Sequence, residues 1–285
     1  MKIAIVYTFR DVAAVGIVNK LIYNNVSCIE LSARDFQVEK YEKCILEGVE
    51  YALLGFNEEV LYLKHLDMLK DFDMIIVPSR HESESKIPCL TVHVTGNPWR
   101  RNDFGGDPMS LSLSNPVVMW LILQDLYIAR KSYDKISKFY VSYEATHHGP
   151  TVKKVPILFV EIGSSENEWR DPIAQETISN AIRSSIKKYY SLGSSKPCKI
   201  AIGFGGSHYA PLFTKRALEK NECYGHMIPN YVIRELGIND LKFIAKMAIE
   251  NTPQAEIVVI EKMRSELRNA IIDVTKQYGL EYIVI

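Results

Sequence analysis

Short valine- and isoleucine-rich runs alternate with amphipathic stretches along the whole chain, and this alternation most narrows the folds open to it. In α/β proteins, buried strands read as short apolar runs, and the segments between them read as helices with one apolar face. No internal repeat interrupts the pattern. The predicted strands lie at 2–8, 27–31, 43–48, 74–79, 89–95, 138–145, 156–163, 198–206 and 256–262.

Amphipathic segments between these strands predict helices, and two of them carry clear start signals. Pro116 follows Ser114 and Asn115, either of which can serve as the N-cap, and Pro172 follows Asp171 in the same way. The other predicted helices lie at 11–23, 210–220, 238–250 and 264–278. This order predicts an α/β fold with a mixed, mainly parallel sheet and helices on both faces.

Composition limits the protein class. The 285 residues are 47% hydrophobic, which is enough for a sizeable core, and we expect residues 1–285 to form a single domain. The 34 basic residues equal the 34 acidic ones, so the chain has no overall positive field for nucleic acid. A nucleic-acid partner would need a local basic face.

The cysteines and the apolar runs bear on location. Five cysteines are widely spaced and form no CxxC pair, which favours reduced, mostly buried thiols over a disulfide framework. No run approaches the roughly 20 apolar residues of a membrane span. We therefore expect a cytoplasmic protein without a membrane partner, as a monomer or small homo-oligomer.

Histidines follow three of the predicted strands. His81 comes after 74–79, His147 and His148 after 138–145, and His208 after 198–206, so that these positions hold four of the seven histidines. In open α/β sheets, ligands bind beyond the carboxyl ends of strands. The placement therefore predicts a functional site built from these side chains.

A zinc site is the chemistry that these side chains favour. His81 and Glu84 are three residues apart and would share one face of a helical turn. With His148 and His208 they would form a nitrogen and oxygen ligand set that leaves one coordination position open for water. The alternative is a solvated acidic turn that carries a surface histidine.

The adjacent pair His147 and His148 poses a separate question, because neighbouring side chains on an extended backbone point in opposite directions. We expect His148 to bind the metal, and His147 or Glu144 to act as general base or to orient a ligand. Glu161 is expected at the far edge of the sheet, because the short link between its strand and the previous one favours an antiparallel pair. There it would support the turn into the next helix.

Two loops are candidates for substrate binding. The backbone N–H groups of Gly205, Gly206 and Ser207 could bind a developing oxyanion, although a plain tight turn also explains the glycines. The loop at 95–106 carries Trp99, Arg100 and Arg101, which could stack on and pair with a nucleotide end. Further basic contacts could come from Lys86, Lys187, Lys188, Lys196 and Lys199.

The chain resembles the archaeal and plant type of D-aminoacyl-tRNA deacylase over nearly its whole length. The segments that carry this resemblance are SRHESESKIPCLTVHVTGN, YEATHHGPT, VPILFVEIGSSENEW, IGFGGSHYAPLFT and GHMIPNY. The resemblance implies hydrolysis of the ester between a D-amino acid and the 3′ end of tRNA. It also implies a zinc requirement and a fold akin to the phosphorylase and peptidyl-tRNA hydrolase group.

Two other classes use the same residues. A zinc-dependent exopeptidase or amidohydrolase acting on small molecules would share the histidines but need no basic rim. A phosphorylase-like enzyme or a non-catalytic nucleotide binder would use the glycine turn for phosphate and leave the histidines without metal. His226, before a helix that starts at Pro229, is either a site residue or part of a helix cap.

Overall fold

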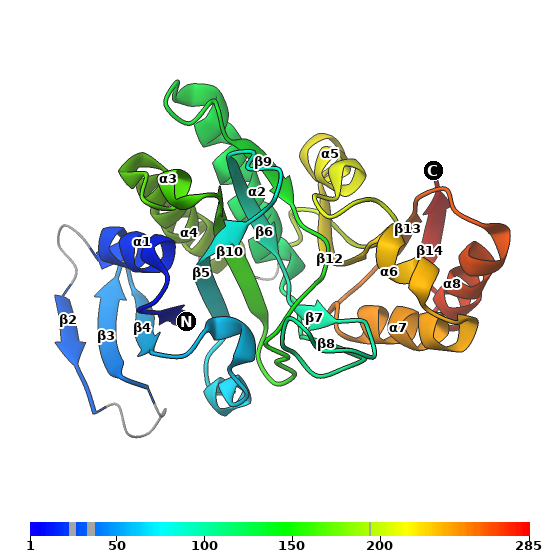
Figure 1. Ribbon diagram of the computed structural model, residues 1–285, viewed down its shortest axis with the longest axis horizontal. Helices are drawn as coiled ribbons and strands as arrows, with labels where there is room; N and C mark the ends of the chain where they lie inside the picture. The colour runs from blue at the N-terminus through cyan, green and yellow to red at the C-terminus, as the bar shows by residue number, and fades with distance from the viewer. Residues whose placement is uncertain (23–26, 33–37, 194) are drawn as a thin grey trace.

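The computed structural model describes residues 1–22, 27–32, 38–193 and 195–285, and most of its strands lie in two sheets (Figure 1). The larger sheet has the order β2-β3-β4-β1-β5-β10-β6-β9. Its pairs are parallel from β4 to β10 and between β6 and β9, and antiparallel elsewhere. The strands are β1 (Lys2–Thr8), β2 (Ser27–Glu30), β3 (Lys40–Leu46), β4 (Val49–Phe56), β5 (Met74–Glu82), β6 (Cys89–His93), β9 (Tyr140–Tyr143) and β10 (Ile157–Ser164).

The smaller sheet is wholly parallel and has the order β12-β11-β13-β14. The mixed, mainly parallel α/β class predicted from the sequence is thereby confirmed, with the strands divided between two sheets. The strands are β11 (Lys199–Phe204), β12 (Glu222–Ile228), β13 (Ile257–Ile260) and β14 (Glu281–Val284), and a short pair consists of β7 (Gly96–Asn97) and β8 (Ser110–Leu111).

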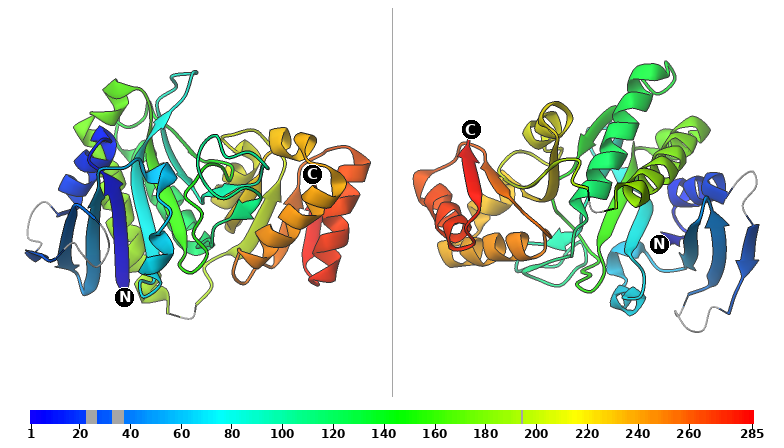
Figure 2. Two further views of the ribbon diagram at one scale, coloured as in Figure 1. Left: turned by 60° about the horizontal axis from the view of Figure 1, so that its bottom comes forward. Right: turned by 180° about the vertical axis from the view of Figure 1, so that it is seen from behind.

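Helices and loops divide the two faces of the larger sheet. One face packs on helices α1 (Val12–Ile22), α2 (Pro116–Ser132) and α4 (Pro172–Leu192), which lie in front of the sheet in the right-hand view of Figure 2. The other face packs on loops and two short 3₁₀ segments, Val60–Tyr62 and Leu66–Leu69. This second face is therefore covered by irregular chain, which can leave a cavity.

The smaller sheet has helices on both of its faces. Helix α5 contributes Phe213 and Ala217 to the core that it shares with α2, and helices α6 to α8 pack on the other face. The remaining helices are α3 (Glu166–Trp169), α5 (Pro211–Lys220), α6 (Asn230–Glu235), α7 (Ile238–Glu250) and α8 (Ser265–Gln277). None of the helices in the described part of the chain is long and apolar enough to cross a membrane.

The predicted helix starts are confirmed. The Asn115 side chain accepts a hydrogen bond from the Val118 N–H, and the Asp171 side chain accepts from the N–H groups of Ile173 and Ala174. Such bonds satisfy donors that have no partner within the helix. The predicted helix at 11–23 matches α1, although residue 23 lies outside the described residues.

One predicted strand is misplaced, and five strands of the structure were not predicted: β4, β7, β8, β12 and β14. The predicted strand at 43–48 runs through a hairpin turn, since Glu47 and Gly48 have φ angles of 51° and 80° and separate β3 from β4. Strand β12 contains Gly225, a residue that is uncommon in strand interiors. Gly225 allows a close approach, because a Cβ atom there would lie 2.6 Å from Thr252.

The expectation of free thiols is wrong for four of the five cysteines. Cys28 faces Cys44 across the antiparallel pair β2 and β3, and the two form a disulfide. Cys198 and Cys223, at the start of β11 and in β12, form another, and Cys89 is free and buried. The spacing of cysteines in the sequence does not predict strand register, and it is strand register that brings each pair together.

His226 joins the smaller sheet to the loop after β9 and is not exposed to a site. Its Nε2–H donates to the Ser112 carbonyl oxygen at 2.9 Å, and its Nδ1 accepts from the Thr146 hydroxyl at 3.1 Å. The Thr146 oxygen in turn accepts the Met227 N–H. Complete burial lowers the pKa of His226 to about 4, so the imidazole is neutral at pH 7.

Acid should destabilise the protein through His226. Between pH 6.5 and about 4, the unfolded chain protonates this histidine while the folded chain does not, so stability falls as the pH falls. The loss is on the order of 3 kcal/mol. Unfolding by urea at several pH values should show this slope in the wild type and a shallower one in His226→Asn. Equal slopes would contradict the assignment.

The Cys198–Cys223 disulfide should also contribute to stability. It closes a separation of 25 residues, for which the loss of unfolded-state entropy corresponds to roughly 3 kcal/mol. We expect Cys198→Ser combined with Cys223→Ser to lower the free energy of unfolding by about that amount. Reductant should lower the stability of the wild type by at least that amount, because it also opens Cys28–Cys44. Cys89→Ser should remain as sensitive to reductant as the wild type.

Candidate active site

A cluster of histidines and glutamates lies on the loop-covered face of the larger sheet, where the short strands β6 and β9 end. His81 lies near the end of β5, His93 is the last residue of β6, and Glu161 lies in β10. Glu144 directly follows β9, and its N–H donates to the Val92 carbonyl oxygen. The cluster therefore lies on a sheet face and not beyond the carboxyl edge that we expected.

Strand register explains why Glu161 belongs to this cluster. Strand β10 runs parallel to β5 and pairs Glu161 with Ser79, whose hydroxyl donates to the Glu161 carboxylate at 2.6 Å. The expected antiparallel relation between β9 and β10 holds, but β10 is the one that shares the direction of β5. The placement of Glu161 at a remote edge is therefore wrong.

His81 lies between the two carboxylates. Its Nδ1 is 3.2 Å from a Glu144 oxygen and 3.3 Å from a Glu161 oxygen, and its Nε2 is 3.1 Å from the Tyr209 hydroxyl. Burial lowers the pKa of His81, but the two carboxylates outweigh it and raise the pKa to about 9. The same contacts hold the pKa of Glu161 well below its usual range despite burial.

Glu144 is fully buried and faces three imidazoles. Its carboxylate oxygens lie 3.1 Å from His208 Nε2 and 3.5 Å from His147 Nε2, besides the contact with His81. Burial and then Glu161 raise the pKa of Glu144, but His208, His81 and His93 together outweigh them and lower it, so the group stays ionised. Neither oxygen has a well-formed hydrogen bond among the described residues, although both lie within ion-pair distance of a histidine.

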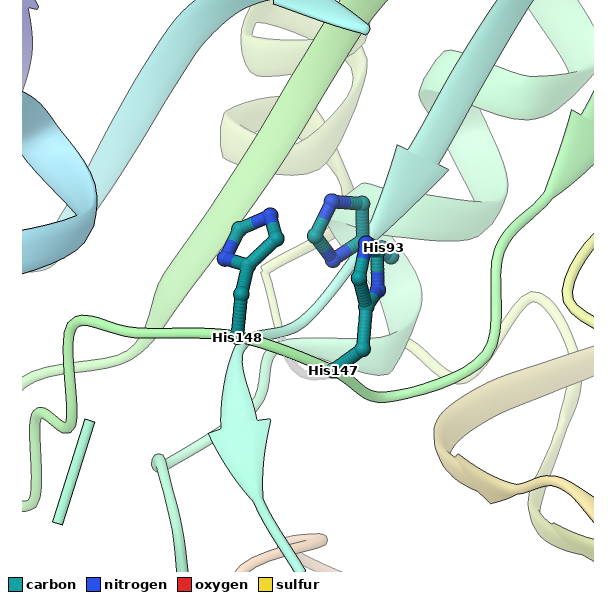
Figure 3. Close-up of side chains that lie close together, drawn as sticks. All are labelled: His93, His147 and His148. Carbon is teal, nitrogen blue, oxygen red and sulfur yellow. The ribbon is translucent and has the colours of Figure 1, made fainter. Parts of the chain in front are cut away.

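The imidazoles of His93, His147 and His148 lie close together, with one ring nitrogen of each within 4.8 Å of the others (Figure 3). Their Nδ1 atoms donate to backbone carbonyl oxygens: His93 to Val94 at 3.2 Å, His147 to Ala145 at 2.8 Å and His148 to Gly149 at 2.6 Å. A backbone bond at Nδ1 fixes the ring and leaves the Nε2 lone pair free, which is the usual arrangement of a metal-binding histidine.

The pKa shifts of two of these histidines favour the neutral imidazole, which keeps a nitrogen lone pair for a metal. Burial and then the neighbouring histidines lower the pKa of His147 well below its usual value, and burial and then His93 lower that of His148 to about 4. Both rings are therefore neutral at pH 7, as metal binding requires. Burial opposes protonation of His93 as well, but the Glu161 carboxylate, 3.6 Å from its Nε2, raises its pKa.

The backbone at His148 explains the adjacent pair. Its φ angle of 45° is left-handed, so the two side chains do not diverge as they would on an extended strand, and the His147 and His148 ring centroids lie 4.3 Å apart. The loop is bound to the smaller-sheet side of the molecule, since the Ala145 N–H donates to the His208 carbonyl oxygen and the Thr146 N–H to that of Met227.

Three groups of side chains have the spacing of a metal site, and within each group the ligand atoms lie within 4.8 Å of one another. The groups are His93 with His147 and His148, His81 with Glu144 and His208, and His93 with Glu144 and Glu161. Glu84 belongs to none of them and is exposed beyond the end of β5. The predicted pairing with His81 fails because His81 lies in a strand, where residues three apart do not share a face.

Only some of the substrate-binding residues predicted from the sequence lie at the site. The cluster opens into a cavity of about 710 Å³, whose lining includes Arg101 and Trp99. Arg100 instead pairs with Asp240, and Gly205 already donates its N–H to the Ile228 carbonyl oxygen. Neither these two residues nor Gly206 and Ser207 line the cavity.

The predicted lysines do not line this cavity either, and four of them lie beside acidic side chains: Lys187 beside Glu47, Lys188 beside Asp125, Lys196 beside Glu256 and Lys199 beside Glu281. Lys86 is exposed in the turn after β5.

Sequence reasoning missed His93, although a signal for it exists. Residues 89–95 alternate apolar Leu90 and Val92 with polar Thr91 and His93. All four side chains are fully buried, so one face of a buried strand is polar. Buried polar groups need partners, so such a face points to a site.

Known proteins resemble this chain over nearly its whole length. A family profile described as D-aminoacyl-tRNA deacylase matches residues 68–283. A protein of that name from Staphylothermus marinus is 35% identical and covers 98% of both chains. Another, from Pyrococcus horikoshii, is 35% identical and covers 99% of both.

One solved structure also matches this chain over its whole length. The crystal structure of a conserved protein of unknown function is 28% identical, has a TM-score of 0.84 and covers 100% of this chain and 95% of that one. A methylthioadenosine phosphorylase from Schistosoma mansoni matches with a TM-score of only 0.36 at 14% identity and carries no argument.

Zinc should stabilise the protein through these side chains. We expect Zn²⁺ to raise the unfolding temperature of the wild type, since a ligand that binds the folded state stabilises it. Glu161→Gln and His93→Ala should reduce that gain, and Glu84→Gln, the matched control, should keep it. Loss of a ligand should weaken zinc binding by more than the roughly 10- to 100-fold that loss of an outer-shell partner costs. Equal gains in all four proteins would contradict the assignment.

Proposed function

This chain belongs to the D-aminoacyl-tRNA deacylase family, and from that membership we propose that it hydrolyses the ester between a D-amino acid and the 3′ end of tRNA, releasing both. The observation that supports this most is the buried cluster of two carboxylates and five histidines beside a cavity of about 710 Å³. That volume lies within the usual range for small-ligand pockets and is suited to an aminoacylated tRNA terminus.

We propose zinc as the cofactor. The fit rests on buried polar atoms without hydrogen-bond partners among the described residues, namely His93 Nε2 and both Glu144 carboxylate oxygens. His93, His147 and His148 would hold the ion through their Nε2 atoms, which leaves a position open. When bound, zinc supplies a nucleophilic water at neutral pH and polarises the ester carbonyl.

Glu144 is the best candidate for the general base. It stays ionised although buried, and a carboxylate with unpartnered oxygens can accept the proton that the attacking water loses. His208, whose Nε2 lies 3.1 Å from Glu144, has a side chain that is 33% exposed and lines the cavity. It would pass a proton to the leaving 3′ oxygen of the ribose.

Glu161 and His81 would position this pair. His81 bridges Glu161 and Glu144, so its positive charge lowers the repulsion between the two carboxylates. The Ser79 hydroxyl fixes Glu161 from the other side. This role differs from the metal-binding role that the sequence suggested for His81.

We propose that residues 1–285 work as one domain in the cytoplasm, where charged tRNA is used. The cluster is complete only when both sheets contribute, because His208 follows β11 of the smaller sheet and Glu144 follows β9 of the larger one. Binding would involve the acceptor end of tRNA with few phosphate contacts, because most of the predicted basic residues are engaged elsewhere. Such binding should weaken only modestly with salt.

Hydrolysis of D-tyrosyl-tRNA and L-tyrosyl-tRNA tests the proposal. We expect rapid loss of the D-ester alone, abolished by chelation and restored by Zn²⁺. Glu144→Gln should lower kcat by roughly 10²- to 10⁴-fold, as expected for a lost general base, and Glu84→Gln should leave it unchanged. Equal hydrolysis of both esters, or none, would overturn the proposal and favour a zinc hydrolase of small molecules.

A further inference from the structure

The cavity has an aromatic portion that the proposed hydrolysis does not explain. Besides the histidine and glutamate cluster, its lining includes Trp99, Arg101 and Tyr231. The ring centroids of Trp99 and Tyr231 lie 5.7 Å apart, with 31° between the ring planes. The Arg101 guanidinium lies over the indole, with its Cζ atom 5.1 Å from the ring centroid.

We propose that Trp99 and Tyr231 form a stacking subsite for the terminal nucleobase of the substrate, an inference that rests on the proposed function. Aromatic rings and arginine planes are the surfaces on which proteins stack unpaired RNA bases. The terminal base of mature tRNA is adenine, a flat purine with hydrogen-bond acceptors in its plane.

The subsite is held in place before any ligand arrives. The backbone N–H of Trp99 donates to the Asn97 side-chain oxygen at 3.1 Å, and the backbone carbonyl oxygen of Trp99 accepts the Met109 N–H at 2.8 Å. The Asn97 side-chain amide also donates to the Arg101 carbonyl oxygen at 2.7 Å. Trp99 and Tyr231 both pack against the core of the smaller sheet, so the rings are supported from behind.

Close backbone contacts fix the loop that carries Trp99. Gly105 has a φ angle of 70°, and a Cβ atom there would lie 2.2 Å from the Leu61 carbonyl oxygen. Gly149, next to His148, has the same restriction, because a Cβ atom would lie 2.3 Å from both that oxygen and the Gly106 nitrogen. The loop at 95–106, which carries Trp99, therefore contacts the loop that carries His147 and His148.

An unpartnered donor favours a nucleotide over an apolar amino-acid side chain. The Trp99 indole N–H is buried and has no hydrogen-bond partner among the described residues. Buried indole N–H groups normally find an acceptor, and leaving one unpaired costs free energy. The ribose hydroxyl groups of a nucleotide whose base stacks here would supply that acceptor, whereas an aliphatic or phenyl side chain would not.

The charge of Arg101 points to a neutral ring and not to a phosphate. Its guanidinium lies 3.3 Å from Asp103 and 3.6 Å from Glu235, so two carboxylates offset its charge. A phosphate would meet this negative charge, while the flat face of the guanidinium remains suited to stacking.

Tyr231 connects this subsite to the hydrolytic cluster. Tyr231 lines the same cavity as His148, Glu161 and His208. Burial and then the charge of Glu144 raise the pKa of Tyr231 to about 12, so the phenol stays neutral. A base stacked here would place its ribose 3′ ester between the aromatic rings and the carboxylate. Binding of the base would therefore help to orient the bond that is cleaved.

The first test compares a substrate with a base and one without. For D-tyrosyl-tRNA, Trp99→Ala should lower kcat/KM by roughly 5- to 150-fold more than it lowers that for D-tyrosine methyl ester, because stacking contributes only to the first. Trp99→Phe should recover part of the loss. Trp120→Phe, a change outside the cavity, should affect neither substrate. Equal losses for the two substrates would overturn the subsite.

The second test needs no catalysis. Adenosine 5′-monophosphate should bind the wild type in titration calorimetry, and ribose 5-phosphate, which lacks the base, should bind far more weakly. Trp99→Ala should abolish this difference. If AMP binds through Trp99 but D-tyrosyl-tRNA is not cleaved, the proposed function fails and the subsite stands. If the two probes bind alike, the subsite fails even for an active deacylase.

Discussion

Two buried glutamates impose the constraint on which this structure depends. Glu144 and Glu161 are almost fully buried, and among the described residues their ion-pair partners are all histidines. A buried carboxylate without compensation costs several kcal/mol, so the surrounding imidazoles must offset that cost. Part of this buried polarity stays unsatisfied, which is consistent with a place built for a further charged group.

The constraint extends across four neighbouring strands. Register aligns Ser79 in β5, Glu161 in β10, Thr91 in β6 and Ser142 in β9 in one row of buried polar side chains. Polar groups on the buried face of a sheet weaken the core there. The opposite face, packed on helices, is apolar and carries the stability of the sheet.

The sequence predicts where the helices and strands lie along the chain better than it predicts which of them are adjacent in the fold. Apolar runs located most strands, and the caps at Asn115 and Asp171 located helix starts, because these signals are local. Register is not local, and three errors share that cause: the position of Glu161, the pairing of Cys198 with Cys223, and the division into two sheets. The ligand pair of His81 and Glu84 failed for a simpler reason, since a helical spacing was assumed within a strand.

The loop that carries His147 and His148 is hydrogen-bonded on one side to Gly96 and on the other to His208 and Met227 of the smaller-sheet half. An ion held by this loop and by His93 would fix the conformation of the segment that contacts both halves of the molecule. Amide hydrogen exchange across the smaller sheet would then be coupled to metal occupancy, although no ligand lies in that sheet.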